Sequence, residues 1–212
     1  MNPDNFNAED VIQKIKFPNI KPLTAQEKFA KVYSQKDYLE DLDQLGQRLL
    51  AVHPHPLKFI TKDQFLKNIE IKKSMINEKT TYAEFAWHCN AIIASVGCSH
   101  TASSNMQNDY HEFSMLPLEN SFPLQVRWVN KQLFVVNPVN NSDKVKVKDE
   151  ILSINGIETE NLMTDIYNHI ASQANIQTSK TQHFNTYFAA LIPYSLGLPK
   201  TFEIVVKETS GS

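Results

Sequence analysis

Three consecutive residues near the middle of the chain place two hydroxyls beside an imidazole: Ser99, His100 and Thr101. A neutral imidazole can accept the proton of a serine hydroxyl at physiological pH, because its pKa is ordinarily about 6.5. The neighbouring Ser99 hydroxyl can fix the tautomer of the ring through a hydrogen bond. The sequence therefore makes His100 a candidate base, or the partner of a base, with Ser99 beside it. The alternative is that His100 only satisfies carbonyl groups at the end of a helix.

The other histidines and the two cysteines form no comparable arrangement. His53 and His55 are separated by one proline, and neighbours at this spacing in an extended chain can face one ion, but no cysteine or carboxylate partner is evident nearby. We interpret the pair as part of a rigid turn between helices. Cys89 and Cys98 are too few for a disulfide scaffold and lack C-x-x-C spacing, and Cys89 falls on the apolar face of a helix. We therefore expect no metal and no cofactor.

Helical periodicity fills the residues that lead up to this stretch. Predicted helices begin after Ser34, Thr61 and Thr81, where a hydroxyl residue is followed three positions later by Asp, Gln or Glu. The first of these helices must end at His53-Pro54-His55-Pro56, because proline disfavours helical backbone in the residue before it. A glycine after the third helix can take the left-handed conformation that ends it. Residues 34–97 are thus expected to form three antiparallel helices.

The spacing of apolar residues changes to a period of two in the second half. Leu124, Val126 and Trp128 occupy alternate positions, which is typical of a strand. Residues 149–156 predict a short apolar strand that ends in an Asn-Gly turn, and residues 201–207 predict a closing strand. Between these two strands we expect three elements: a helix capped by Thr159, a loop over 174–182 and a short helix over 184–191. The second half is therefore expected to be a small α+β domain.

The composition limits the classes of partner. A chain of 212 residues suits one large or two small domains, and a net charge of −2 gives no reason to expect nucleic acid as a partner. No apolar run approaches the ~20 residues of a membrane span. The first residues, Met1-Asn2-Pro3-Asp4, lack the basic and apolar regions of a signal peptide. We expect either a cytoplasmic protein or one whose export signal is missing from this sequence.

Residues 149–156, D-E-I-L-S-I-N-G, resemble the signature of a PDZ domain, G-D-x-I-L-x-I-N-G followed by a helix. Lys148 stands where that pattern has glycine, and a positive φ would cost a lysine about 1–2 kcal/mol. We therefore expect the turn and the recognition groove to differ from those of a standard PDZ domain. PDZ domains bind peptides by strand addition, which makes Leu124, Val126 and Trp128 candidate peptide-binding residues. The alternative is that these three side chains belong to the core.

A wider resemblance covers residues 33–207. The pattern D-L-D-x-L-x-x-x-L-x-x-x-H-P over Asp41–Pro54 is followed by aromatic-rich helices, by G-x-x-H-T over Gly97–Thr101 and by the PDZ-like octet. This order resembles the N-terminal half of the tail-specific, or C-terminal processing, serine peptidases. Within that family it is most similar to the tricorn-like branch, in the version found in proteins of the Bacteroidetes type.

The resemblance implies that a catalytic core follows the PDZ-like module and carries the nucleophilic serine. The base is a lysine of the core in the processing peptidases, or a Ser-His pair from the upstream helical region in the tricorn-like branch. Ser99 and His100 match that pair, so they are candidate catalytic residues together with the absent core. The chain contains no G-x-S-x-G motif, and we expect it to be inactive alone. Members of the family are commonly exported to the cell envelope, which is the compartment that the resemblance implies.

Two functions remain open from the sequence. The first is a regulatory and substrate-positioning segment of a serine peptidase, whose partners are a peptide or protein substrate and the missing catalytic core. The second is a stand-alone PDZ-like module that binds peptides without catalysis. In both cases the expected fold is α+β, with an antiparallel helical bundle followed by a small PDZ-like mixed β/α domain. The expected boundaries are an N-terminal extension with short helices over 1–33, a helical bundle over 34–101, a linker over 102–121, the PDZ-like domain over 122–208 and a tail over 209–212.

Overall fold

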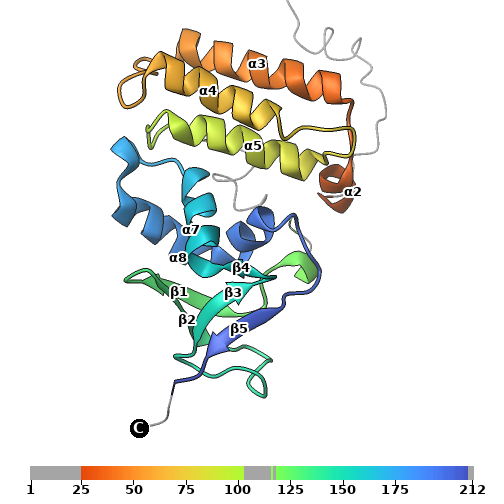
Figure 1. Ribbon diagram of the computed structural model, residues 1–212, viewed down its shortest axis with the longest axis vertical. Coiled ribbons are helices and arrows are strands. Elements are labelled where there is room, and N and C mark those ends of the chain that lie inside the picture. Colours follow the sequence, from red (N-terminus) through yellow and green to blue (C-terminus); the bar gives the residue numbers. More distant parts are fainter. Residues whose placement is uncertain (1–24, 103–115, 117, 210–212) are drawn as a thin grey trace, which may run out of the picture.

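The computed structural model describes residues 25–102, 116 and 118–209, and these residues form a mixed α/β structure of six α-helices and a five-stranded antiparallel sheet. Three long helices form a layer at one end of the molecule, and the sheet lies at the other end, with two further helices between them (Figure 1). Most of the expected N-terminal extension and linker lies outside the described residues. The expected domain boundaries stay a prediction.

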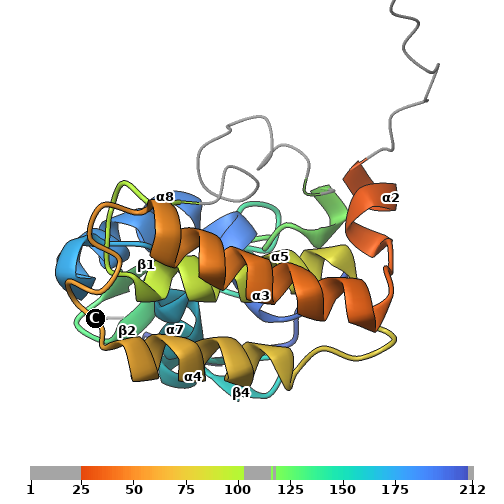
Figure 2. The ribbon, with the colours of Figure 1, turned by 90° about the horizontal axis from the view of Figure 1, so that it is seen from above.

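The helical layer consists of three helices that pack on one another side by side (Figure 2). Successive helices of the layer run in opposite directions (Figure 1). A shorter helix precedes them and packs against the last of the three. The four helices are α2 (Ala25–Ala30), α3 (Gln35–Val52), α4 (Lys62–Lys73) and α5 (Tyr82–Ser95).

The three predicted helix starts are confirmed by their caps. The side chains of Ser34 and Thr61 each accept a hydrogen bond from the backbone N–H three residues further on. Thr81 forms a complete capping box, because its hydroxyl accepts from the Glu84 N–H while the Glu84 carboxylate accepts from the Thr81 N–H at 2.8 Å. A hydroxyl cap of this kind typically contributes about 1 kcal/mol. Local sequence alone therefore determines where these helices begin.

The sheet is built from two hairpins and a closing strand. Its hydrogen-bonded order is β1-β2-β3-β4. β2 and β4 pair with different parts of one edge of β3, and β5 pairs with the opposite edge. Asn130 and Lys131 form the first turn and Asn155 and Gly156 the second, and all four residues have positive φ, as two-residue hairpin turns require. The strands are β1 (Gln125–Val129), β2 (Gln132–Asn137), β3 (Glu150–Ile154), β4 (Ile157–Glu158) and β5 (Ile204–Lys207).

Two predictions between β4 and β5 are wrong. Thr159 does not cap α7 (Thr159–Asn168); its hydroxyl instead donates to the Ile151 carbonyl at 2.7 Å and ties the helix to the sheet. The expected loop and short helix are both covered by α8 (Gln177–Ser195), a helix with a kink at Tyr187 (φ −119, ψ 17), and the 3₁₀ turn η4 (Gln173–Asn175) precedes it.

The long helix α8 depends on a contact from outside itself. Pro193 has no N–H to donate to the Ala189 carbonyl four residues earlier. The Phe122 N–H donates to that carbonyl instead, at 3.0 Å. The backbone of α8 is therefore joined to the segment that leads into β1, and this long-range bond satisfies a group that the local sequence leaves unpaired.

Two hydrophobic cores share helix α5. Phe85 and Ile92 face the core between α3, α4 and α5. Ala86 and Trp87 belong to the core that continues through α7, α8 and the sheet. Because α5 is apolar on two sides, it is buried between α3 and α4 on one side and the core of α7, α8 and the sheet on the other.

Lys148 has a left-handed backbone conformation, which glycine adopts at little steric cost. Its φ is 77, and whether this turn differs from that of a PDZ domain stays a prediction. Its N–H donates to the Val135 carbonyl at 2.8 Å, and its carbonyl accepts from the Thr209 hydroxyl at 2.6 Å. The turn is held by these bonds to its neighbours, so the lysine keeps the conformation at a cost in free energy.

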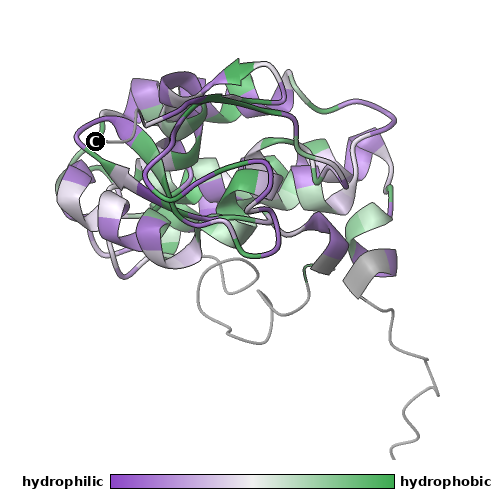
Figure 3. Cartoon of the chain, turned by 90° about the horizontal axis from the view of Figure 1, so that it is seen from below, coloured by the Kyte–Doolittle hydropathy of each residue, from purple (hydrophilic) through white to green (hydrophobic). Residues whose placement is uncertain are grey.

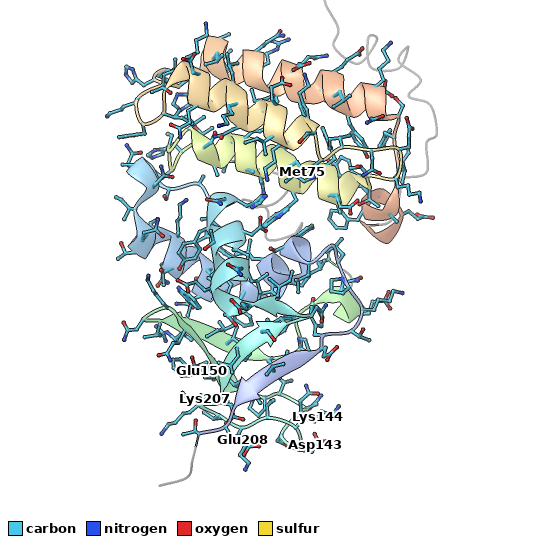
Figure 4. All side chains as sticks on the ribbon, viewed as in Figure 1. Met75, Asp143, Lys144, Glu150, Lys207 and Glu208 are labelled. Atoms are coloured by element: carbon cyan, nitrogen blue, oxygen red, sulfur yellow. The ribbon has the colours of Figure 1, made fainter. Side chains whose placement is uncertain are left out.

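The surface at the sheet end is charged. Glu150 of β3 and Lys207 of β5 lie beside each other far from the helical layer, with 3.6 Å between the Lys207 Nζ and a Glu150 carboxylate oxygen (Figure 4). Seen from below, hydrophobic and hydrophilic residues are interspersed along the helices and strands (Figure 3). Within the described residues, no helix combines the length and apolar character needed to cross a membrane.

Lys148→Gly should stabilise the protein by up to about 1.5 kcal/mol. The change removes a positive-φ cost of roughly 1–2 kcal/mol and adds roughly 0.5–1 kcal/mol of chain freedom in the unfolded state. Lys146→Gly is the matched control, because Lys146 is also exposed in this turn but does not have a positive φ; it should destabilise the protein. Urea unfolding of both variants measures the two changes, and a loss of stability in Lys148→Gly would contradict the assignment of strain to this residue.

Candidate functional site

The stretch that follows α5 lies where the two halves of the structure meet. Gly97 has φ 69, and its carbonyl accepts a hydrogen bond from the Ala174 N–H of η4 at 2.9 Å. A Cβ atom on Gly97 would lie 3.1 Å from the Phe59 Cβ atom. Glycine is therefore required here both for its backbone conformation and for the close approach of the α3–α4 connection.

Three connections enclose a cavity of about 560 Å³ at this point. One is the α3–α4 connection, one is the stretch after α5, and the third is η4. No aspartate or glutamate is among the lining residues. They are His53, Pro54, His55, Lys58, Phe59, Cys98, Ser99, His100, Thr101 and Gln173.

Ser99 and His100 are both exposed at this cavity, and the Ser99 Oγ lies 3.5 Å from the His100 Nδ1. This distance is at the outer limit of a hydrogen bond. The carbonyls of Ile93 and Ala94 at the helix end accept from the backbone N–H groups of Val96 and Gly97, so they do not need the imidazole. The helix-capping alternative is thus not supported at these two carbonyls, and a chemical role for His100 stays a prediction.

Cys98 is a candidate site residue that sequence reasoning missed. The Thr101 hydroxyl is the main cause that lowers the pKa of the Cys98 thiol, and the backbone and imidazole of His100 lower it further. Cys89 is the opposite case, because burial raises the pKa of its thiol to about 12. A thiolate is the reactive form of cysteine. The only signal in the sequence was the short spacing between Cys98 and the hydroxyl and imidazole that follow it.

His53 and His55 line the same cavity but interact with each other. The His55 backbone N–H donates to the His53 Nδ1 at 3.1 Å, which occupies one ring nitrogen of that residue. Within the described part of the chain, no group of three or more histidine, cysteine, aspartate or glutamate side chains is placed to hold a metal ion. The pair forms part of the turn between α3 and α4.

The candidate peptide-binding residues lie in the core. Leu124, Val126 and Trp128 are 3%, 2% and 8% exposed, which favours the core interpretation over the groove. The edge of β1 is also covered: the Trp128 N–H donates to the Asn185 side-chain oxygen at 2.8 Å, and the Asn185 amide donates back to the Trp128 carbonyl at 3.2 Å. Helix α8 thus occupies hydrogen-bonding groups that an added strand would use.

Gly97→Ala should destabilise the protein by about 2–5 kcal/mol. The backbone conformation costs an alanine roughly 1–2 kcal/mol, and the close contact with Phe59 adds a packing cost of roughly 1–3 kcal/mol. Gly197→Ala is the matched control, because Gly197 has φ 72 but nothing within 4 Å of a Cβ atom. Equal losses in the two variants, measured by urea unfolding, would contradict the close contact with Phe59.

Cys98 should react with iodoacetamide at pH 7 much faster than Cys89. The lowered pKa gives Cys98 a larger thiolate fraction at any pH, whereas a pKa of about 12 leaves Cys89 almost entirely protonated. Thr101→Val should slow the reaction, because it removes the main cause of the lowered pKa. Mass spectrometry of the alkylated protein gives the rate at each thiol, and an unchanged rate in Thr101→Val would show that the hydroxyl does not activate Cys98.

The residues around the Ser99–His100 cavity were compared with known proteins through the whole chain. Comparison with known proteins finds no matching protein-family model and no matching curated protein.

Proposed function

We propose that this chain is the regulatory and substrate-positioning segment of a serine peptidase of the tail-specific type, tricorn-like branch. The single observation that carries the proposal is the Ser99–His100 pair. Both side chains are exposed, lie 3.5 Å apart and line a cavity, but no carboxylate lines that cavity to orient the imidazole. Such a pair is an incomplete site, since a Ser-His system needs an orienting third group. In the proposed enzyme the remaining groups come from a catalytic core.

The arrangement of the sheet supports the PDZ-like part of the proposal. Residues 149–156 include β3, and the Asn155–Gly156 turn joins it to β4 and then directly to α7. Lys148, at the glycine position of the PDZ pattern, has the left-handed conformation that glycine favours. These features fit a signature strand followed by a helix, which is the order expected for a PDZ-like module.

The stand-alone peptide-binding module is the weaker proposal. Strand addition needs free N–H and C=O groups on a sheet edge. On β1 the Asn185 amide already bonds both backbone groups of Trp128. Peptide would have to displace a helix that is also held through its Ala189 carbonyl. A segment that positions substrate through its loops is more consistent with this closed edge than a module that captures peptide ends.

The proposal is tested in a polypeptide that continues through the reading frame beyond Ser212. His100→Ala should lower kcat/KM for a fluorogenic casein substrate by about 10²–10⁴-fold, the usual contribution of a general base. Glu78→Ala changes an exposed turn residue remote from the cavity and serves as the control with unchanged kcat/KM. The 212-residue chain alone should show no hydrolysis and no labelling by a fluorophosphonate probe.

Two results would contradict the proposal. Wild-type kcat/KM in His100→Ala would exclude His100 from the reaction. Fluorophosphonate labelling of Ser99 in the 212-residue chain would make Ser99 itself a nucleophile and would remove the need for a separate core.

A further inference from the structure

A second cavity, of about 560 Å³, lies between the helical layer and the connection from α7 to α8. The charged residues of its lining are all positive. The lining contains two lysines and five side-chain amides but no aspartate or glutamate. The lining residues are Phe59, Ile60, Gln64, Asn68, Ile71, Lys72, Ala91, Ile92, Ala94, Ser95, Asn168, Asn175, Gln177 and Lys180.

Lys180 is a buried cation without a matching anion. It is only 4% exposed, and its Nζ donates to the Tyr167 carbonyl at 2.6 Å. An ammonium group has three N–H donors, and buried charges are ordinarily paired with an opposite charge. Among the described residues, no carboxylate forms an ion pair with Lys180. Burial lowers the pKa of Lys180, which is the expected effect of a desolvated cation without a counter-ion.

Lys72 brings a second cation to the same cavity from the opposite side, since it lies on α4 and Lys180 lies on α8. Burial is the main influence on Lys72 and lowers its pKa, while the Asp165 carboxylate acts in the opposite direction. Asp165 does not line the cavity, and it accepts a hydrogen bond from the Ser195 hydroxyl. The positive charge that faces the cavity is therefore not balanced within its lining.

The beginning of α8 adds to this positive potential. The helix runs from Gln177 to a kink at Tyr187 before it continues, and its N-cap residue, Ile176, provides no side-chain hydrogen bond to the first turn. Backbone N–H groups in the first turn of a helix lack intrahelical partners and carry a partial positive charge. Gln177 and Lys180, both in that first turn, line the cavity. Helix starts of this kind bind anions.

We propose that this cavity is a binding site for a small oxyanion, a phosphate or carboxylate group, held by Lys180, Lys72 and the first turn of α8. The amide side chains of Gln64, Asn68 and Asn168 supply further N–H donors. The site is independent of the proposed peptidase function, because it shares neither Ser99 nor His100. If the oxyanion site is disproved, the peptidase proposal is unaffected, and the reverse also holds.

The test is isothermal titration of the 212-residue chain with inorganic phosphate and, separately, with acetate, at constant ionic strength set with sodium chloride. We expect saturable binding of at least one anion; the two arms distinguish a phosphate site from a carboxylate site. Lys180→Met should weaken binding by about tenfold or more, because it removes a charged hydrogen-bond donor. Lys67→Gln is the matched control, since Lys67 is exposed on α4 outside the cavity.

A second measurement separates lost binding from lost folding. Without added anion, Lys180→Met should keep or raise the melting temperature, because it replaces a buried, unmatched charge with an apolar side chain. With phosphate or acetate, wild type should melt at a higher temperature, and Lys180→Met should shift less at the same anion concentration. Absence of binding by both anions in wild type would overturn the proposal. Equal weakening in Lys180→Met and Lys67→Gln would also overturn it, by showing that only net charge matters.

Discussion

The structure depends on one packing contact between its two halves, the stack of Trp87 on His169. The ring centroids are 3.9 Å apart and the planes are 6° from parallel, and the Tyr194 ring lies 5.9 Å from that of Trp87 on α8. Trp87 comes from α5, whose other face is buried among α3 and α4. This contact therefore joins the helical layer to the rest of the molecule, and the Ala174–Gly97 backbone bond beside both cavities joins the same two halves.

Burial favours the neutral form of the His169 imidazole in this stack. His169 is 1% exposed, and burial lowers its pKa to about 4, below the ordinary 6.5; the Asp165 carboxylate opposes this shift without cancelling it. Because the folded-state pKa lies below the unfolded one, the unfolded state binds the proton first as pH falls. The contribution of His169 to stability is complete above about pH 6.5 and is lost between about pH 6.5 and 4. The junction is thus held by an uncharged contact at neutral pH.

Sequence reasoning succeeded where the determining interactions are local and failed where they are distant. The caps at Ser34, Thr61 and Thr81 and the two-residue turns are encoded within a few positions. Helix α8 was predicted as loop and short helix because its first half is polar and Pro193 interrupts its second half; the Phe122 N–H that completes it comes from far along the chain. The turn at Lys148 is held in the same way, by bonds to Val135 and Thr209 that no local pattern reveals.

The candidate sites show the same difference between what local sequence reveals and what only the folded structure reveals. Ser99 and His100 were visible because they are adjacent, whereas Lys180 is polar in a polar stretch and only its burial makes it unusual. Phe59 lines both cavities, and η4 contributes Gln173 to one and Asn175 to the other. A ligand in one cavity would therefore contact a wall of the other. A ligand shifts a conformational equilibrium only by the difference between its affinities for the two conformations. The shared residues therefore couple the two cavities only if Phe59 or η4 has different positions when each cavity is occupied. The Phe59 side chain is 36% exposed, so any coupling between the two cavities would depend on its ring and on η4 rather than on the close approach of its Cβ atom to Gly97.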